Sequence, residues 1–353
     1  MAASATSTFY CLPDHLVGDI LSQAGQLDSC LAVSSSVRKE AIMAATRMKV
    51  MCGMRFPLVT SKLIHLRYVD CRNAALTDLS RLAACALLTN FDCSGTQVSD
   101  LSPLAACTAL VSLDCRKTQV SALSPLATCA LLTSLNCSKT NVSDLSPLAA
   151  CTALTSLDCS DTQVSALSPL VACAALQALV CFNTKVSDLS PLATCVTLTS
   201  LDCSGTHVSD LSPLAACVAL MTLSCWGTQV TDLSPLSACT ALRGLDCMHT
   251  MVEDLSPLTA CTALQTLSIG DTCVIDLSPL SACTALASLN CEFTDVIDLS
   301  PLAACTALQF LDCMHTMVID LSPLTVCTAL PILAMGVPAI DQSCSVTVHG
   351  IFA

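Results

Sequence analysis

The sequence of 353 residues is poor in aromatic and in basic side chains. Aromatic residues make up only 3% of the chain, so its core has to be filled by aliphatic side chains and cysteine. There are 14 Lys and Arg against 27 Asp and Glu, which gives a formal net charge of −13. Because binding to a phosphate backbone needs a basic face, we expect no nucleic-acid partner. A content of 53% hydrophobic residues excludes a disordered chain.

Several sequence signals of common protein classes are also missing. No run of about 18 apolar residues is present, and no basic stretch followed by an apolar one opens the chain, so we expect no membrane span and no signal peptide. The 28 cysteines include no CxxC pair, which removes the common zinc and redox spacings. The motifs GxxxxGK[ST], GxGxxG, GxSxG and HExxH do not occur. We therefore expect a protein that is not an enzyme and that holds no metal and no cofactor.

A repeat of 22 residues dominates the chain. From Leu66 the pattern L-x-x-L-x-C-x-x-T-x-V-x-D-L-S-P-L-x-x-C-x-x recurs without insertion, giving twelve full units over residues 66–329 and the start of a thirteenth. Each unit is called a coil below. A strict period of this length indicates a solenoid in which stacked coils share one core.

The sequence of one coil predicts its local structure. The L-x-x-L-x-C stretch alternates like a strand, so successive strands are expected to pair in parallel. Ser-Pro-Leu is expected to open a short helix or 3-10 turn, with Ser as the N-cap and Pro at the first helical position. The Asp two residues before that Ser is expected to bond local backbone in the turn.

This pattern resembles leucine-rich repeats over residues 66 to about 336, and it is most similar to the internalin-type and SDS22-like subclass. The resemblance implies an α/β solenoid with a parallel concave sheet and short helical or 3-10 convex turns. Cysteines at two positions of the coil also resemble the cysteine-containing repeats of F-box proteins. Where such repeats usually carry Asn, eleven of the twelve coils carry Thr, whose hydroxyl is expected to bond backbone in the neighbouring coil.

Two ladders hold most of the thiols. One runs every 22 residues from Cys85 to Cys327, and the other from Cys71 to Cys313 with Ile269 in place of one Cys. An aliphatic replacement fits packing and does not fit metal ligation, so we interpret the ladder cysteines as small buried hydrophobes. Stacked metal sites or ladder disulfides are the alternatives. Reduced thiols predict an intracellular protein, cytoplasmic or nuclear and not secreted.

The residues before the repeat differ in composition. Residues 1–65 carry six basic and four acidic side chains, whereas residues 66–353 carry eight and twenty-three. An amphipathic helix is expected from Leu12 to Leu21, and a basic helical stretch from Ala41 to Val50. The Leu-Pro opening, the Ile-Leu pair and the Leu-Ala-Val-Ser stretch resemble an F-box over residues 12–50. The resemblance implies that a Skp1-like adaptor of a cullin ubiquitin ligase docks on Leu12, Pro13, Leu16, Ile20, Leu21, Leu31 and Val33. The alternative is a helical cap on the first coil.

The predicted organisation has five parts. They are a disordered tail (1–11), the F-box-like helical module (12–50), a linker or N-terminal cap (51–65), the solenoid (66–336) and a C-terminal cap (337–353). The leading interpretation is an F-box-type substrate receptor whose repeats bind a protein target, with the chain monomeric outside a complex. The alternatives are a stand-alone repeat scaffold or regulatory binding protein without a ligase link, and a secreted adhesion-type repeat protein.

A partner site is predicted on the outward positions of the strand side. Most of these positions carry Ser, Asp or Gly, and large apolar side chains appear after the ladder Cys only from the sixth coil onward. Exposed aromatic and Met side chains are typical anchors for a protein partner, and an acidic row beside them favours a basic one. The predicted site on this concave face comprises Phe182, Trp226, Met248, Glu292, Met314, Asp202, Asp246 and Phe310.

Overall fold

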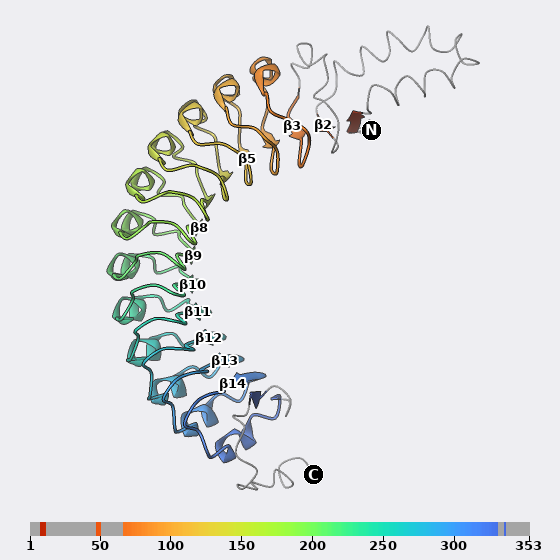
Figure 1. Ribbon diagram of the computed structural model, residues 1–353. Coiled ribbons are helices and arrows are strands. Elements are labelled where there is room, and N and C mark those ends of the chain that lie inside the picture. The colour runs from red at the N-terminus through yellow and green to blue at the C-terminus, as the bar shows by residue number, and fades with distance from the viewer. Residues whose placement is uncertain (1–7, 12–46, 51–65, 331–334, 337–353) are drawn as a thin grey trace, which may run out of the picture. The chain divides into compact units, whose positions relative to one another are not determined.

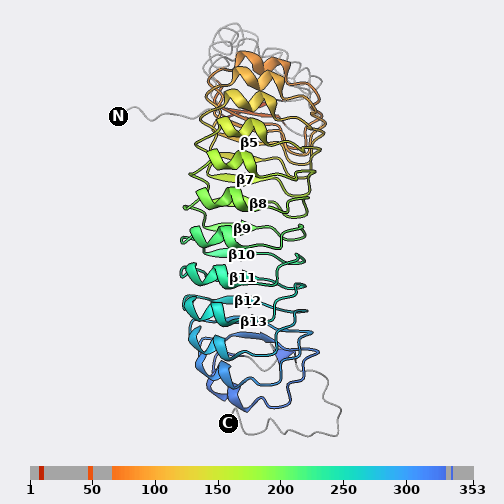
Figure 2. The same cartoon turned by 90° about the vertical axis from the view of Figure 1, so that its left-hand side faces the viewer.

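The computed structural model describes residues 8–11, 47–50, 66–330 and 335–336. The chain divides into two compact halves, residues 1–165 and 166–353, which are taken one at a time. In each half short parallel strands lie on one side, and 3-10 helices form a row on the opposite side (Figure 1). Figure 2 faces the row of 3-10 helices. The elements of the N-terminal half are β1 (Thr8–Cys11), β2 (Arg47–Val50), β3 (Tyr68–Asp70), η2 (Ser80–Ala84), β4 (Asn90–Asp92), η3 (Ser102–Ala106), β5 (Ser112–Asp114), η4 (Ser124–Thr128), β6 (Ser134–Asn136), η5 (Ser146–Ala150) and β7 (Ser156–Asp158).

The C-terminal half continues the same alternation of strand and 3-10 helix. Its elements are η6 (Ser168–Ala172), β8 (Ala178–Val180), η7 (Ser190–Thr194), β9 (Ser200–Asp202), η8 (Ser212–Ala216), β10 (Thr222–Ser224), η9 (Ser234–Ala238), β11 (Gly244–Asp246), η10 (Ser256–Ala260), β12 (Thr266–Ser268), η11 (Ser278–Ala282), β13 (Ser288–Asn290), η12 (Ser300–Ala304), β14 (Phe310–Asp312), η13 (Ser322–Val326) and β15 (Met335–Gly336). The expected leucine-rich solenoid is confirmed, and all helices in the described residues are of the 3-10 type.

The strand register follows the repeat. Leu223 of β10 pairs with Leu245 of β11, which pairs with Leu267 of β12, so each residue meets its counterpart 22 positions on. The last strand breaks this rule, because Met335 of β15 pairs with Leu311 and not with the position of Cys313. The thirteenth coil therefore does not continue the register that the period predicts.

The core of each coil is aliphatic and thiol-lined. In the coil that begins at Leu242, the inward Leu245, Val252, Leu255 and Leu258 are at most 2% exposed. Burial of this kind stabilises by about 25 cal/mol for each Å² of apolar surface removed from water. Since one coil has no second layer of its own, this burial requires stacked neighbours.

The opening of each 3-10 helix differs from the prediction. The flanking residue is Leu and Ser is the first helical residue, so Ser is not the N-cap. The backbone N–H of Ser212 donates to Oδ1 of Asp210 at 2.7 Å, and its hydroxyl donates to Oδ2 at 2.8 Å. The Asp was expected to bond local backbone, and this is confirmed. In other coils the equivalent two bonds from Ser lower the pKa of the Asp carboxyl. These residues are Asp100, Asp144, Asp188, Asp232, Asp254, Asp298 and Asp320.

The Thr row also differs from the prediction. The hydroxyl of Thr206 donates to the carbonyl oxygen of Cys203 in its own coil, and Thr96 does the same to Cys93 at 2.6 Å. The Thr therefore closes the turn after the strand and does not reach the neighbouring coil. Backbone bonds supply the link between coils at this place, as from Gln97 N–H to the carbonyl of Leu76 at 3.0 Å.

Most of the N-terminal prediction falls outside the described residues. Residues 12–46 include every residue of the F-box-like docking set, and residues 51–65 are the predicted linker. Two described segments differ from the expectation. Thr8–Cys11 form strand β1 where a disordered tail was expected, and Arg47–Val50 form strand β2 where the basic helix was expected to run. Within the described part of the chain, no helix is long and apolar enough to cross a membrane.

Candidate functional site

The predicted site residues lie in the C-terminal half, but most of them are not on strands. Trp226, Met248 and Met314 lie in the turns that follow β10, β11 and β14, and Phe310 opens β14. Trp226 and Met314 are each 38% exposed and Phe310 is 43% exposed. Phe182, Met248 and Glu292 are half-buried. The turns therefore present a discontinuous row of large side chains along one edge of the strands.

These side chains lean toward the next coil. Phe182 lies over Gly205, where an added Cβ would meet its ring at 3.8 Å. The ring of Trp226 meets that of His249 edge to face, with centroids 5.6 Å apart. Nδ1 of His249 lies 2.5 Å from Oδ2 of Asp271. Trp226, His249 and Asp271 thus form a contact chain across three consecutive coils, which is called the Trp226 chain below.

Gly270 lies between two of these large side chains and leaves room for them. An added Cβ would meet Met248 Cε and Glu292 Cγ at 3.0 Å each, so those two side chains close over the glycine from both sides. Asn290 Nδ2 donates to Glu292 Oε1 at 3.3 Å and so orients that carboxylate. The predicted Met248 and Glu292 are brought together, whereas Phe182 lies over Gly205, several coils away along the chain.

The acidic row has a structural role that sequence reasoning missed. Oδ1 of Asp202 accepts the N–H of Ser204 at 3.0 Å, and Oδ1 of Asp246 accepts the N–H of Met248 at 3.2 Å. The carboxylates therefore hold the turns that carry the site. A short polar chain joins them, because the Ser224 hydroxyl lies 2.7 Å from that of Ser204 and donates to Asp246 Oδ2 at 3.4 Å.

The two halves differ in how this row is neutralised. In the N-terminal half, Arg72 pairs with Asp70 at 2.8 Å and Arg116 pairs with Asp114 at 3.3 Å. Over the described residues of the C-terminal half, Asp202 and Asp246 form no ion pair. Residues 166–330 hold fourteen acidic and two basic side chains. The unpaired negative charge is therefore concentrated where the large apolar side chains are.

The outward turn position of His249 and Asp271 was detectable in the sequence from the residues that occupy the same position in other coils. The same coil position carries Asn183, Gly205 and Gly227, and the backbone there has positive φ in all of them. Gly and Asn favour this conformation because the usual Cβ clash is small or absent. A row rich in Gly and Asn thus marks a turn whose side chains project outward.

The ladder cysteines are buried, as predicted. All 24 cysteines of residues 66–330 are free thiols, and among them only the off-ladder Cys273 is not buried. The ladder from Cys85 to Cys327 donates to carbonyls of the preceding coils, as from Cys239 Sγ to Leu214 O at 3.5 Å. Desolvation raises the pKa of Cys107 and Cys225 to about 12. In the described residues no cluster of three His, Cys, Asp or Glu side chains has the geometry of a metal site.

Comparison with known proteins supports the fold. A family model that describes two copies of a leucine-rich repeat matches residues 131–172. The structure is similar to an internalin, InlF of Listeria monocytogenes, with 25% identity, a TM-score of 0.78 and coverage of 83% of this chain and 87% of that one. The functional domain of InlJ from the same species, which includes a cysteine ladder, is similar with 23% identity, a TM-score of 0.65 and coverage of 76% and 68%.

A more distant likeness is to a plant receptor. The peptide hormone receptor RGFR1, solved in complex with RGF2, has 13% identity, a TM-score of 0.61 and coverage of 82% of this chain and 58% of that one. No curated protein sequence matches this chain. Residues 66–330 therefore have the fold of a leucine-rich repeat solenoid, with internalin-like structural neighbours.

Proposed function

We propose that the chain is a protein-binding scaffold whose partner lies against the turns that follow the strands of the C-terminal half. The observation that carries this proposal is Trp226, the single Trp of the chain, which is 38% exposed and lies edge-on against His249. Trp in a rigid setting is a frequent anchor at protein interfaces. Support also comes from RGFR1, a protein of the same fold that is solved with a peptide hormone.

The partner of this surface is a basic segment. Asp246 and Asp202 lie beside the anchors without an ion pair among the described residues, and the half supplies only Lys185 and Arg243 as fixed cations. Opposite charges across an interface accelerate encounter and fix the register of the complex. The N-terminal half offers no such surplus at Asp70 and Asp114, because its own arginines are paired there.

Replacement of Trp226 by Ala is expected to weaken partner binding by more than about 1 kcal/mol, because the exposed aromatic anchor is lost from the surface. Partners captured by the full chain are quantified with wild-type and variant protein, and Trp fluorescence of the wild type is followed on binding. Arg116→Ala is the matched control in the other half. If the control abolished binding while Trp226→Ala left the affinity intact, the site would lie on the N-terminal coils.

A second candidate function is that of an F-box-type substrate receptor in a reducing compartment. It is favoured by the Leu12-Pro13 opening and by the amphipathic spacing of Leu16 and Ile20, all outside the described residues. In this case a Skp1-like adaptor binds the N-terminal segment and the repeats hold the target. The stand-alone scaffold has no such adaptor.

Co-purification of a Skp1-like adaptor with the full chain is expected under the second candidate, and Leu16→Ala with Ile20→Ala is expected to abolish it by removing the apolar face. The circular dichroism and melting of the repeats serve as the control for folding. An intact chain that retains no adaptor would leave the stand-alone scaffold as the function.

A further inference from the structure

A second apolar surface lies on the flank of the last four coils. Three residues before the Ser that opens each 3-10 helix, the first eight coils carry Ser or Thr, at Thr77, Ser99, Ser121, Ser143, Ser165, Ser187, Ser209 and Thr231. In the last three coils this position carries Ile275, Ile297 and Ile319, which are 64%, 60% and 78% exposed. The ninth coil carries Glu253 at this position. The appearance of branched aliphatic side chains in the three adjacent coils that follow is not explained by packing, since these side chains face outward.

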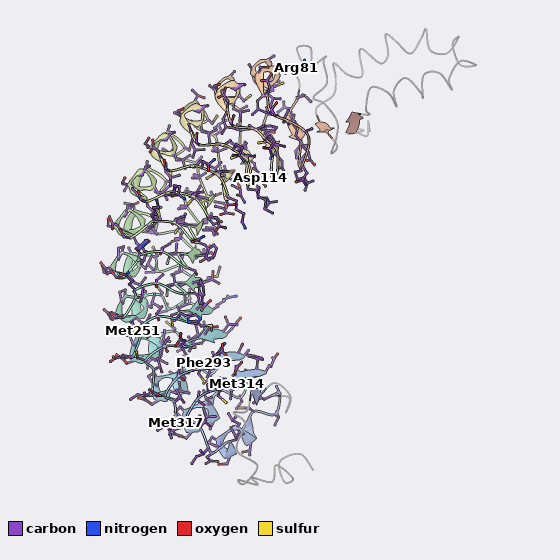
Figure 3. The ribbon with its side chains drawn as sticks, viewed as in Figure 1. Arg81, Asp114, Met251, Phe293, Met314 and Met317 are labelled. Carbon is purple, nitrogen blue, oxygen red and sulfur yellow. The ribbon has the colours of Figure 1, made fainter. Side chains whose placement is uncertain are left out.

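Neighbouring positions extend this surface. Met251 and Met317 lie two residues before the same row and are each 62% exposed. The backbone there is tied coil to coil, with Met317 N–H donating to Val296 O at 3.0 Å. In Figure 3 Met314 lies on the strand side, and Met251 and Met317 lie toward the 3-10 helices. The flank patch is defined as Met251, Ile275, Phe293, Ile297, Met317 and Ile319.

The backbone conformation of Phe293 distinguishes the flank patch from an ordinary exposed surface. The Phe293 backbone has φ of +54°, a conformation that a bulky residue rarely adopts because the Cβ crowds the backbone. The ring is nevertheless 54% exposed and stacks on His315 with centroids 4.3 Å apart. Gly occupies the same coil position at Gly205 and Gly227, so an unstrained residue is available to this fold. An aromatic side chain held outward at a backbone cost is typical of a contact site.

The surroundings of the flank patch are strongly acidic. Residues 242–330 contain ten Asp and Glu and one basic residue, Arg243. Glu253, Asp271 and Asp295 are exposed in the same coils as the patch. An apolar patch with an acidic rim complements a segment whose apolar side chains are bordered by Lys or Arg.

We propose that the flank patch binds a partner segment with apolar side chains bordered by Lys or Arg. A second copy of this chain fits poorly, because it would place the acidic rims of two patches together. Residues 331–353 also fit poorly, since they contain one Asp and no Lys or Arg. The flank patch shares no residue with the Trp226 chain, so separate variants test the two proposals.

The test replaces Ile275, Ile297 and Ile319 by Ser, the residue that most other coils carry in this row. Random peptides displayed on phage are selected on the full wild-type chain, and the selected peptides are synthesised and titrated against both proteins. We expect apolar sequences bordered by Lys or Arg that lose about tenfold or more in affinity for the triple variant. Ser99→Thr, Ser121→Thr and Ser143→Thr together form the matched control, which is expected to bind like the wild type.

A second variant separates binding from folding. Phe293→Gly removes the ring and relieves the backbone, so it is expected to lower peptide affinity without lowering the melting temperature. Trp226→Ala is expected to leave the peptides bound. If no selected peptide depends on the three isoleucines, or if the selected sequences are acidic, the proposal is wrong. Sedimentation that shows a dimer in the wild type and a monomer in the triple variant would assign the patch to self-association and overturn it as well.

Discussion

Raising the pH from 7 to 9 under reducing conditions is expected to remove about 8 kcal/mol from the free energy of unfolding. Twenty ladder thiols have a raised pKa, caused first by desolvation. At pH 9, which equals the ordinary thiol pKa of 9.0, half of these thiols are ionised in the unfolded chain, whereas they stay neutral in the folded chain. Each thiol then favours the unfolded state by about 0.4 kcal/mol.

The direction follows from the raised pKa values. The stability that the neutral buried thiols contribute is fully present below the ordinary thiol pKa. It is lost as the pH rises toward the pKa that the thiols have in the folded state, about 11 at Cys173 and about 12 at Cys107. Since a typical domain is stable by only about 5–15 kcal/mol, a steep alkaline unfolding transition is expected near about pH 9 to 10. Circular dichroism in denaturant at several pH values measures it.

Thiol titration supplies the control for this prediction. At neutral pH the buried ladder thiols should react slowly, since reactivity follows thiolate character and exposure, and the half-buried Cys273 should be labelled first among the described thiols. After denaturation close to 28 groups should react. An unfolding free energy that is unchanged between neutral pH and about pH 9 would show that the ladder thiols are already ionised or oxidised in the folded protein.

Truncating Leu245 to Ala is expected to cost about 3 kcal/mol or more, because the side chain is fully enclosed and the site cannot collapse without moving both neighbouring strands. Leu245 is 2% exposed and lies in register between Leu223 and Leu267. In a repeat array each coil contacts only its neighbours, so the loss of hydrogen-exchange protection should centre on residues 220–285.

Met251→Ala is the matched control for Leu245→Ala. Met251 belongs to the same coil and is 62% exposed, so its truncation should change the unfolding free energy by no more than about 0.5 kcal/mol. Equal melting temperatures for the two variants would contradict the burial of Leu245. Uniform loss of protection along the whole repeat would contradict nearest-neighbour coupling.

The period made the fold predictable, because a strict 22-residue repeat leaves one way for inward Leu and Cys to meet their counterparts. Burial of Leu245 and Cys247 and the register of β10 to β12 follow directly from it. The local bonds were less predictable. Ser212 and Asp210 are both capping residue types, and only the backbone position shows that Asp accepts and Ser donates.

The site was predictable in its residue types and not in its geometry. The sequence predicted Trp226 and Met248 on outward positions of the strand side, whereas both lie in the turns that follow the strands and lean toward the next coil. That lean depends on the small Gly270 and on the positive φ of His249, which bring side chains of successive coils together. Such contacts are set by side-chain packing across coils, and a pattern within one coil carries no information on them.

The fixed 22-residue register also explains how a binding surface can grow. Every coil meets its neighbours through the same strand pairing, so a copied coil fits the stack wherever it is inserted as a whole. The stretch from Met248 to Met251 reads Met-His-Thr-Met, and the same four residues recur from Met314 to Met317. The C-terminal half therefore carries this Met-His-Thr-Met stretch twice as a result of duplication, and the inward positions of the two coils are unchanged. A partner with two matching segments would hold both at once, and its affinity would rise through linkage alone, with no new kind of contact.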